Sequence, residues 1–539
     1  MAIAAQQHCG KAVYDYLLCK KSKLKRMKPS LYSALFLCLF LYACTATKPT
    51  ANGNDGIINI QFVQINDVYE IAPIEAGKVG GVARVATLKK ELKAKNLLTD
   101  LIIAGDFLSP SVYNNLSYQG KRVRGRQMVD CLNEAGLDIA AFGNHEFDIS
   151  ESELISRINE SKFQWISSNS YHKTKDAIIP FVKTVGNQSH RLPTYIIKTY
   201  KDADGTEARL GIMGINIPFN RNSYVEYTDP FETAEKIYNT IKDSCDAVIA
   251  ITHQDEQDDI LLARQLPGIP LIMGGHEHDM RFDKVGQTII SKAHANARSA
   301  YVLNLQINKN TGNIKVTPTL RMIDTSIAID PVTNQTVQKW MQIANENFAS
   351  LGFDVKKVVM ATGPGLDARE ASVRSGQTNF TRLLVKAIEA AAPQAQVSIV
   401  NSGSIRPDDV LMPPLTQYDV LRTLPFGGGI TLVEMKGSLL IQILNAGLQN
   451  KGTGGFLQYS EAIQYHESQK EWRLNNTVIE NNNTYKVAIT DFLLTGGESK
   501  MDFLTKKNPL ISKIYPVATS NQDPMADIRV ALIQYLQKQ

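Results

Sequence analysis

Short apolar runs alternate with segments of helical spacing from about residue 57 to about residue 330. Apolar side chains recur every three or four residues in the segments 81–95, 125–135 and 232–243, which predicts three helices. The apolar runs between them are short, rich in Ile, Val and Ala, and bounded by Gly or polar residues, so they predict strands. Such alternation is typical of an α/β layered domain.

The pattern changes towards the end of this region. Short strands are expected at 289–292, 299–305 and 314–320, and the polar tract 308–313 is expected to form a hairpin loop. Asp330-Pro331 interrupts the pattern, and a helix is expected from about residue 332 to residue 350.

A second α/β domain is expected after this helix. A chain of 539 residues is too long for one hydrophobic core, because single cores stop growing near ~250–300 residues. The second half predicts helices at 380–392 and 439–448 and strands at 397–400 and 485–490. The predicted organisation is a layered domain over 57–330, a linker helix over 331–354 and a second domain over 355–539.

The N-terminal 56 residues predict a targeting segment. Basic residues are clustered up to Lys28, and the apolar stretch that begins at Leu31 is about 11–13 residues long, which suits a signal sequence and is too short for a membrane span. Residues 1–44 are therefore predicted to be the signal and residues 45–56 a polar tether. Met27 is a candidate start, because the residues before it do not fit a compact signal.

The end of the apolar stretch, Leu41-Tyr42-Ala43-Cys44, resembles the lipobox of bacterial lipoproteins. The resemblance implies cleavage before Cys44, a lipid on Cys44, and a membrane-anchored location outside the cytoplasm, in the periplasm or at the cell surface. An ordinary secretory signal with a chance cysteine is the alternative.

Charge and cysteine content narrow the picture further. The net charge of +5 is small, and no basic stripe with interleaved aromatic residues is present, so no nucleic-acid partner is expected. Only Cys131 and Cys245 lie in the body of the chain, where two isolated thiols are expected and a disulfide is the alternative. The sequence predicts no oligomeric state.

Five of the apolar runs end in residues that bind metals well. Ligands in open α/β sheets gather at the carboxyl ends of the strands, so these ends are expected to meet in one metal centre. The five ends are Asn66-Asp67, Asp106, Asn144-His145-Glu146, His253 and His276-Glu277-His278.

Two of these ends carry recognisable motifs. Gly143-Asn144-His145-Glu146-Phe147-Asp148 and Gly275-His276-Glu277-His278 resemble the motifs of the calcineurin-like metallophosphoesterases. The second half resembles the C-terminal domain of 5′-nucleotidases, so the chain resembles the 5′-nucleotidase family over roughly residues 57–510. The resemblance implies a four-layer α/β/β/α sandwich followed by an α/β nucleotide-binding domain.

The resemblance also implies a centre of two divalent metal ions. Two such ions can clamp the attacking and transferred oxygens of a phosphate ester, and a hydroxide held between them would attack phosphorus. Mixed Asp, Asn and His ligands suit Zn, Mn, Co or Fe. One ion would be surrounded by Asp106, Asn144, His253 and His276, and the other by Asp67, Asp106 and His278.

His145 is not a ligand in the family. The resemblance implies that it stabilises the developing charge or protonates the leaving oxygen, and that Asp148 orients it. The usual first motif, Asp-x-His, is here Asp67-Val68-Tyr69. Because a phenol is a poor neutral ligand, we expect this ion to be held weakly, with water completing its ligands. Recruitment of Glu70, or an enzyme with one metal ion, are the alternatives.

Segments of the second domain resemble the family's nucleotide-binding positions. They imply that two phenylalanines stack on the base, that two arginines meet phosphate or other acceptor groups, and that an asparagine contacts the nucleotide. Glu498 stands where the family usually has Asp before Gly and an aromatic residue, which puts ribose contacts in doubt. The candidate binding residues are Arg374, Asn401, Arg406, Phe426, Phe492 and Glu498.

The function expected from these features is hydrolysis of nucleoside monophosphates to nucleosides and phosphate outside the cytoplasm. Variants of this expectation cleave 2′,3′-cyclic nucleotides or nucleotide sugars. A different class is a weakly active surface lipoprotein that binds nucleotides or a host partner, which Tyr69 suggests. Metal sites on one domain and base recognition on the other imply a cleft that closes, with the helix at 332–350 as a hypothetical hinge.

Overall fold

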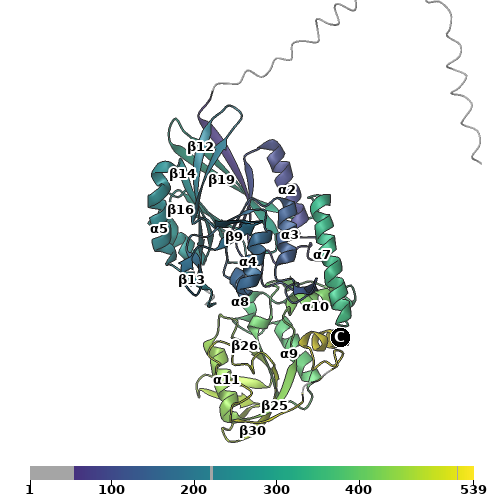
Figure 1. Ribbon diagram of the computed structural model, residues 1–539. Coiled ribbons are helices and arrows are strands. Elements are labelled where there is room, and N and C mark those ends of the chain that lie inside the picture. The colour runs from purple at the N-terminus through teal and green to yellow at the C-terminus, as the bar shows by residue number, and fades with distance from the viewer. Residues whose placement is uncertain (1–53, 219–221, 517, 519) are drawn as a thin grey trace, which may run out of the picture. The chain divides into compact units, whose positions relative to one another are not determined.

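The computed structural model of the protein describes residues 54–218, 222–516, 518 and 520–539 (Figure 1). Met27, Cys44 and the predicted signal segment lie outside the described residues, as does most of the predicted tether. Within the described ranges, no helix is long and apolar enough to cross a membrane.

The first domain contains two six-stranded sheets. The first has the order β19-β18-β1-β2-β5-β6, with β1, β2, β5 and β6 parallel, β18 antiparallel to β1, and β19 antiparallel to β18. Its strands are β1 (Ile57–Ile65), β2 (Thr99–Ala104), β5 (Ile139–Ala141), β6 (Gln164–Ile166), β18 (Ser299–Asn308) and β19 (Asn313–Met322).

The second sheet has the order β11-β12-β14-β15-β17-β16, and its four middle strands are parallel. Its strands are β11 (Tyr195–Lys201), β12 (Glu207–Asn216), β14 (Ala247–His253), β15 (Leu271–Gly275), β16 (Arg281–Val285) and β17 (Thr288–Lys292). Smaller antiparallel pairs and strands lie outside the two sheets: β3 (Ser117–Tyr118), β4 (Lys121–Arg122), β7 (Ser170–Lys173), β8 (Ile178–Ile179), β9 (Val182–Val185), β10 (Gln188–Arg191) and β13 (Val225–Tyr227).

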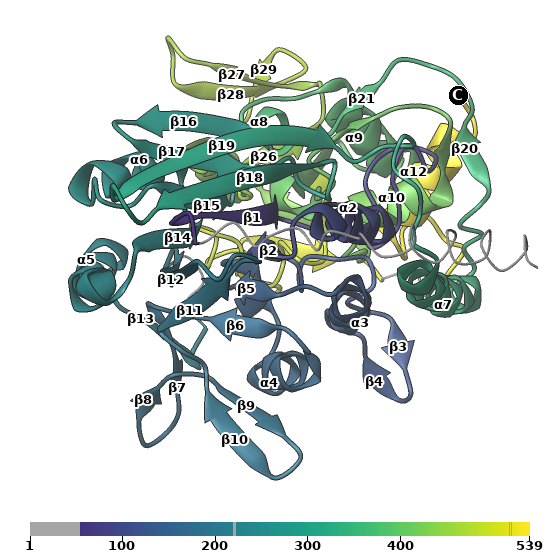
Figure 2. The same cartoon turned by 90° about the horizontal axis from the view of Figure 1, so that it is seen from above.

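Helices cover the outer face of each sheet, which makes four layers (Figures 1 and 2). The two faces of β1 show why: Ile60 and Phe62 enter the core between the sheets, whereas Val63 and Ile65 enter the core under the helices. A strand buried on both faces is expected to be rich in apolar residues, and six of the nine residues of β1 are apolar, while its Gln61 and Gln64 are buried as well. The helices are α2 (Val82–Lys95), α3 (Arg126–Ala135) and α4 (Glu151–Glu160) on one side and α5 (Pro230–Ile241) and α6 (Glu256–Gln265) on the other. The predicted α/β/β/α sandwich is confirmed.

The helix predicted at 332–350 is α7 (Pro331–Ser350), and it packs against α2 and α3 of the first domain. Its N-cap, Asp330, accepts a hydrogen bond from the Thr333 amide at 2.9 Å. The indole of Trp340 is buried and donates a hydrogen bond to Asp130 of α3 at 3.1 Å. The helix that we expected to link the domains therefore rests on the first one.

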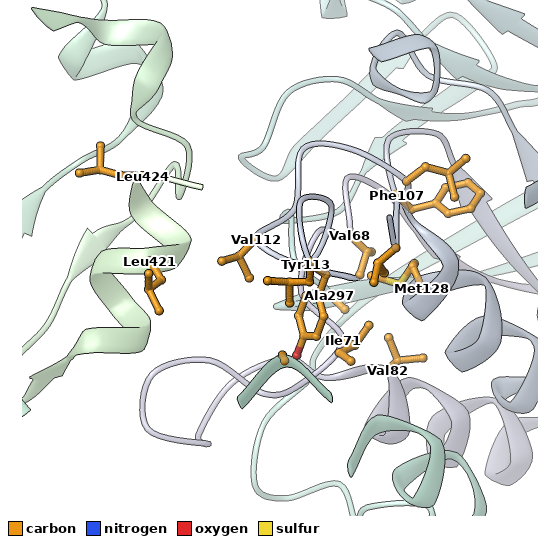
Figure 3. Close-up of a cluster of buried hydrophobic side chains, with 14 of the residues drawn as sticks. Val68, Ile71, Val82, Phe107, Val112, Tyr113, Met128, Ala297, Leu421 and Leu424 are labelled. Atoms are coloured by element: carbon orange, nitrogen blue, oxygen red, sulfur yellow. The ribbon is translucent and has the colours of Figure 1, made fainter. Parts of the chain in front are cut away.

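The second domain surrounds a five-stranded sheet of order β26-β22-β30-β25-β31. The core under this sheet continues into the first domain, since Val112 and Tyr113 share one buried cluster with Leu421 and Leu424 (Figure 3). The main elements are α8 (Glu370–Val373), α9 (Asn379–Ala391), β22 (Val397–Asn401), α10 (Gln417–Thr423), β25 (Ile430–Lys436), α11 (Gly437–Gln449), β26 (Leu457–Tyr459), β30 (Thr484–Thr490), β31 (Ile511–Ile514) and α12 (Ile528–Leu536). Shorter strands complete it: β20 (Val358–Met360), β21 (Leu366–Asp367), β23 (Val410–Leu411), β24 (Leu415–Thr416), β27 (Ile463–His466), β28 (Glu471–Leu474) and β29 (Thr477–Val478).

Both cysteines of the body are free thiols, as expected, with Cys131 buried in α3. No disulfide joins them.

Candidate metal centre and active site

The parallel register of the strands brings the predicted ligand positions to one edge. Ile65 of β1 is paired with Ile103 of β2, and the amide of Asp67 then donates a hydrogen bond to the Gly105 carbonyl at 3.1 Å. In the other sheet, His253 at the end of β14 is paired with Gly275 at the end of β15. The strand ends therefore meet as the sequence predicts.

Three of the predicted ligands form a compact buried group. Asp67, Asp106 and His253 are fully buried, and their candidate ligand atoms all lie within 4.8 Å of one another. His253 Nε2 lies 3.1 Å from Asp106 Oδ2 and 3.9 Å from Asp67 Oδ1. Asp67 and Asp106 adopt φ of 52° and 55°, in the left-handed region, and such backbone strain is concentrated at functional sites.

Asn144 and His276 lie beside this group. Asn144 Oδ1 is 3.2 Å from His276 Nδ1, and the His276 and His253 rings are 5.3 Å apart. The His276 amide donates to Asp67 Oδ2 at 3.0 Å. Close approach requires glycine here: a Cβ at Gly143 would overlap the Asp106 carboxylate. The structure thus brings Asn144 and His276 next to the buried carboxylates.

The donor chemistry fits a divalent cation. His253 Nδ1 lies 2.8 Å from the Ala104 carbonyl, which favours a proton on Nδ1 and leaves Nε2 facing the carboxylates. Nε2 is buried and has no hydrogen-bond partner among the described residues. Burial opposes charge on His253, but Asp106 and Asp67 outweigh it and raise its pKa to about 9. The pocket therefore favours positive charge at this nitrogen, and its O and N donors suit a transition metal.

His145 and Asp148 form the predicted pair. His145 Nδ1 lies 2.7 Å from Asp148 Oδ2, and both residues lie on the short 3-10 helix His145–Asp148 that follows β5. The backbone amide of His145 donates to Asp106 Oδ1 at 2.8 Å. Asp148 also accepts a hydrogen bond from Ser109 at 3.2 Å. The imidazole is thereby fixed next to the buried carboxylates with Nε2 unused by Asp148.

Tyr69 reaches the centre of the group expected to hold the weaker ion. Its hydroxyl is 3.4 Å from Asp67 Oδ1, 3.3 Å from Asp106 Oδ2 and 3.1 Å from His278 Nε2. Burial, Asp106 and Asp67 raise the pKa of Tyr69, so the phenol stays protonated. A neutral hydroxyl therefore stands among three groups that would otherwise face a cation.

Glu146 organises the centre, a role that was not predicted from the sequence. Its buried carboxylate accepts backbone hydrogen bonds from Asp106, Phe107, Leu108 and Gly143 at 2.6–3.0 Å. Burial and the nearby Asp106 raise the pKa of Glu146, and the backbone hydrogen bonds oppose this shift. Its place inside the Gly-Asn-His-Glu motif was the available signal.

Lys292 was also missed. Its side chain is fully buried at the end of β17, and Nζ contacts the Gln254 carbonyl at 2.7 Å, Asp259 Oδ2 at 2.9 Å and the Glu277 carboxylate. Glu277 lies between His276 and His278, and Gln254 follows His253. Lys292 thus joins the two loops that carry the histidines. A lysine at the end of an apolar strand gave no signal of this role.

The arginines expected to bind substrate lie close to the centre. Burial and the positive charge of Arg406 lower the pKa of Arg374 to about 10. Arg374 forms an ion pair with Glu370, and the Arg406 guanidinium lies 5.3 Å from the centre of the Phe426 ring. Arg406 Nε is buried without a hydrogen-bond partner in the described parts of the chain. Such a group suits an anion.

The two candidate stacking residues are half exposed. Phe426 is 52% and Phe492 46% exposed, which does not fit core packing and leaves both rings accessible to a ligand. Asn401, at the end of β22, donates to Glu498 at 2.8 Å, so these two side chains hold one another. A cavity of about 500 Å³ adjoins the centre, and its lining includes His276, His278, Asp255, Glu370, Arg374 and Asp408. Neither phenylalanine lines this cavity.

Family models match both domains. Residues 60–280 match the calcineurin-like phosphoesterase model, and residues 357–506 match the 5′-nucleotidase C-terminal domain model.

Curated relatives match most of the chain. The chain is 24% identical over 508 residues to snake venom 5′-nucleotidase of Naja atra, covering 82% of this chain and 91% of that protein. It is 23% identical over 476 residues to human 5′-nucleotidase, covering 78% of each.

Solved structures share the fold. The 5′-nucleotidase precursor of Thermus thermophilus superposes with a TM-score of 0.68 at 20% identity, covering 89% of this chain and 96% of that one. The sulfate thiohydrolase SoxB of the same organism gives 0.61 at 14% identity, covering 89% and 94%.

Proposed function

Because this chain belongs to the 5′-nucleotidase family, with a calcineurin-like phosphoesterase domain followed by a 5′-nucleotidase C-terminal domain, we propose that it hydrolyses nucleotides to nucleosides and phosphate. The observation that carries this proposal is the buried group of Asp67, Asp106 and His253 with the His145–Asp148 pair beside it. A hydrolase of this class needs metal ligands and a proton carrier within one site.

We assign the metal ligands on the basis of this geometry. Divalent ions, when bound, would offset the phosphate charge and activate water. One ion would be held by Asp106, Asn144, His253 and His276, and the other by Asp67, Asp106 and His278. Zn, Mn, Co and Fe all suit these donors.

The protein's own residues would handle the proton and the anion. His145 would protonate the leaving oxygen through Nε2, because its Nδ1 is engaged by Asp148. Arg374 and Arg406 would bind the phosphate, Phe426 and Phe492 the base, and Asn401 and Glu498 the remaining part of the nucleotide.

Tyr69 supports a weak second ion. Its neutral hydroxyl lies 3.1–3.4 Å from the three groups that would hold that ion, so binding there requires the phenol to move or to serve as a poor ligand. This observation also favours the second candidate function, a weakly active surface protein that binds nucleotides or a host partner.

The likeness of residues 41–44 to a lipobox supports a lipid on Cys44 and a membrane-anchored location outside the cytoplasm. Mass spectrometry of the mature N-terminus, with a Cys44→Ser variant, tests this. A mature chain that begins elsewhere and carries no lipid would contradict it.

A nucleotide panel tests the catalytic proposal. Phosphate release is measured from 5′-monophosphates directly, and from 2′,3′-cyclic nucleotides and nucleotide sugars with an added phosphatase that acts on their phosphomonoester products, with Mn²⁺ or Co²⁺, for the wild type and Asp106→Ala. We expect metal-dependent release by the wild type and a loss of several orders of magnitude in the variant. No release from any nucleotide, with nucleotide binding retained, would favour the binding-protein alternative. Preferential cleavage of cyclic or sugar nucleotides would favour those variants of the activity.

A further inference from the structure

His278 of the first domain is hydrogen-bonded by a carboxylate of the second. His278 Nδ1 lies 2.7 Å from Asp408 Oδ2. The other ring nitrogen, Nε2, lies 3.1 Å from the Tyr69 hydroxyl and 3.6 Å from Asp67 Oδ1. The imidazole therefore joins Asp408 on one side to the predicted metal ligands on the other.

Asp408 is itself held in place. Its other oxygen, Oδ1, accepts a hydrogen bond from the Glu370 amide at 2.5 Å. Its backbone adopts φ of 41°, a left-handed conformation that a residue with a Cβ seldom adopts without compensation. The strain is offset here by two hydrogen bonds to the same carboxylate. Such a residue is built to present its side chain in one direction.

We propose that Asp408 is a positioning residue for His278, an inference that rests on the proposed metal-dependent function. The carboxylate accepts a hydrogen bond from Nδ1–H and so fixes the tautomer whose Nε2 lone pair faces Asp67. A carboxylate behind a metal-binding histidine orients the ring and increases its basicity. Asp408 acts through His278 and does not contact the reacting atoms.

The position of Asp408 links substrate recognition to the metal centre. It lies two residues after Arg406, whose guanidinium is assigned to the phosphate. One short segment of the second domain thus places both a substrate-binding group and the partner of a metal ligand. A displacement of this segment would change both at once, so metal affinity and substrate affinity would be coupled.

A cation bound on the Asp408 side is the competing interpretation. His278, Glu370 and Asp408 offer ligand atoms within 4.8 Å of one another. However, Glu370 is paired with Arg374, and its carboxylate lies 3.7 Å from His278 Nδ1. Asp408 lies within hydrogen-bonding distance of the same nitrogen, and its other carboxylate oxygen accepts the bond from the Glu370 amide. The contacts of this group are those of an oriented histidine.

Manganese binding without substrate tests the proposal. Free Mn²⁺ is followed by electron paramagnetic resonance in titrations of the full chain, for the wild type, Asp408→Asn and Asp408→Glu. We expect one of two ions to bind about 10–100-fold more weakly in Asp408→Asn, with a smaller loss in Asp408→Glu. Unchanged affinities in Asp408→Asn would overturn the proposal. So would anomalous scattering that placed Mn²⁺ at His278 Nδ1.

A control variant and an activity measurement distinguish the role of Asp408 from the proposed hydrolysis of nucleotides. Asp279→Asn removes a carboxylate from the exposed residue next to His278 and is expected to leave both affinities within about twofold. An equal loss in this control would mean that charge alone, and not positioning, is responsible. If Asp408→Asn does not fold, Asp408→Glu carries the comparison. Wild-type protein that binds Mn²⁺ yet hydrolyses no nucleotide would refute the proposed function. The titrations would still test whether Asp408 positions His278.

Discussion

The Tyr69 hydroxyl lies where we propose that a second metal ion is held weakly. An imidazole at this position would direct a neutral lone pair at the ion, whereas the buried phenol stays protonated because burial and two carboxylates raise its pKa. We predict that Tyr69→His binds the second Mn²⁺ about tenfold more tightly, about 1.4 kcal/mol, in calorimetric titrations. Tyr69→Phe is the control, since it removes the hydroxyl without adding a ligand. Equal tight binding of two ions by the wild type and Tyr69→His would exclude a weak site.

The His145–Asp148 pair predicts a graded loss of turnover. We expect His145→Gln to lower kcat about 10²–10⁴-fold with a small change in KM, because general acid catalysis of this size acts in the transition state. Asp148→Asn should cost less, about 10–100-fold, since it only orients the ring. Steady-state kinetics on the best nucleotide of the panel measures both. A larger loss of turnover in Asp148→Asn than in His145→Gln would contradict these roles.

At the scale of single residues, the side chains at strand ends could be predicted from the sequence, whereas the residues that hold those side chains in place could not. Asp106 and His253 end apolar runs, so their convergence follows from parallel pairing. Lys292 and Asp408 act through contacts with residues that are 38 and 130 positions away in the chain. No local pattern encodes such pairs, because the contacts exist only after the sheets and domains have assembled.

At the scale of secondary-structure elements, Lys292 at the end of β17 can be used to test how the loops that carry His253, His276 and His278 are held in place. Lys292 is buried against Asp259 and Glu277, and these carboxylates raise its pKa against the effect of burial. We predict that Lys292→Met lowers stability by about 3–5 kcal/mol, because it leaves the buried Asp259 carboxylate and the partly buried Glu277 carboxylate without their partner. Thermal denaturation measures this. Lys292→Met combined with Asp259→Leu should recover part of the loss, and a double variant less stable than the single one would contradict the explanation.

Helix α7 offers a second test, with a defined pH dependence. Burial opposes ionisation of Asp330, but hydrogen bonds from Lys90 and Thr333 outweigh it and lower its pKa. A lowered carboxyl pKa adds stability above the unfolded value of about 3.9, and this stability is lost as pH falls through the folded value. We predict that Asp330→Ala costs about 0.5–2 kcal/mol at pH 7 through loss of the N-cap, and less near pH 3. Denaturant melts at both pH values measure this, and an equal cost at both would contradict it.

The boundaries of an element could be predicted where apolar residues recur regularly along it. The helices expected at 81–95 and 125–135 begin and end within one residue of α2 and α3. The strand β10 (Gln188–Arg191) was not expected, because all four of its side chains are exposed and it has no apolar face. Helix α6 also escaped notice, since it buries Asp259 against Lys292 and its buried face is therefore partly polar.

The two domains share a buried polar interface as well as an apolar one. Glu70, next to Tyr69, accepts a hydrogen bond from Tyr418 at 2.7 Å, and Arg298 pairs with Asp409 at 2.6 Å. A cleft that closes on its substrate, which the sequence suggested, would have to alter these contacts. We predict that a disulfide joining the domains across this interface reduces turnover and that its reduction restores it. Unchanged turnover in the cross-linked protein would refute closure, including a hinge at 332–350.

Metal ions should stabilise the whole first domain, because their proposed ligands come from both of its sheets. Asp67 and Asp106 follow strands of the first sheet, His253 ends a strand of the second sheet and His276 follows another, so a bound ion adds a link between two layers that meet mainly through apolar packing. Binding to the folded state alone adds about 2.7 kcal/mol at a concentration one hundred times Kd. We therefore expect Mn²⁺ to raise Tm by a few degrees and a chelator to reverse the rise. Asp106→Ala should lose this response, and His190→Ala, on an exposed strand, should keep it. An equal response in Asp106→Ala would place the stabilising ion elsewhere.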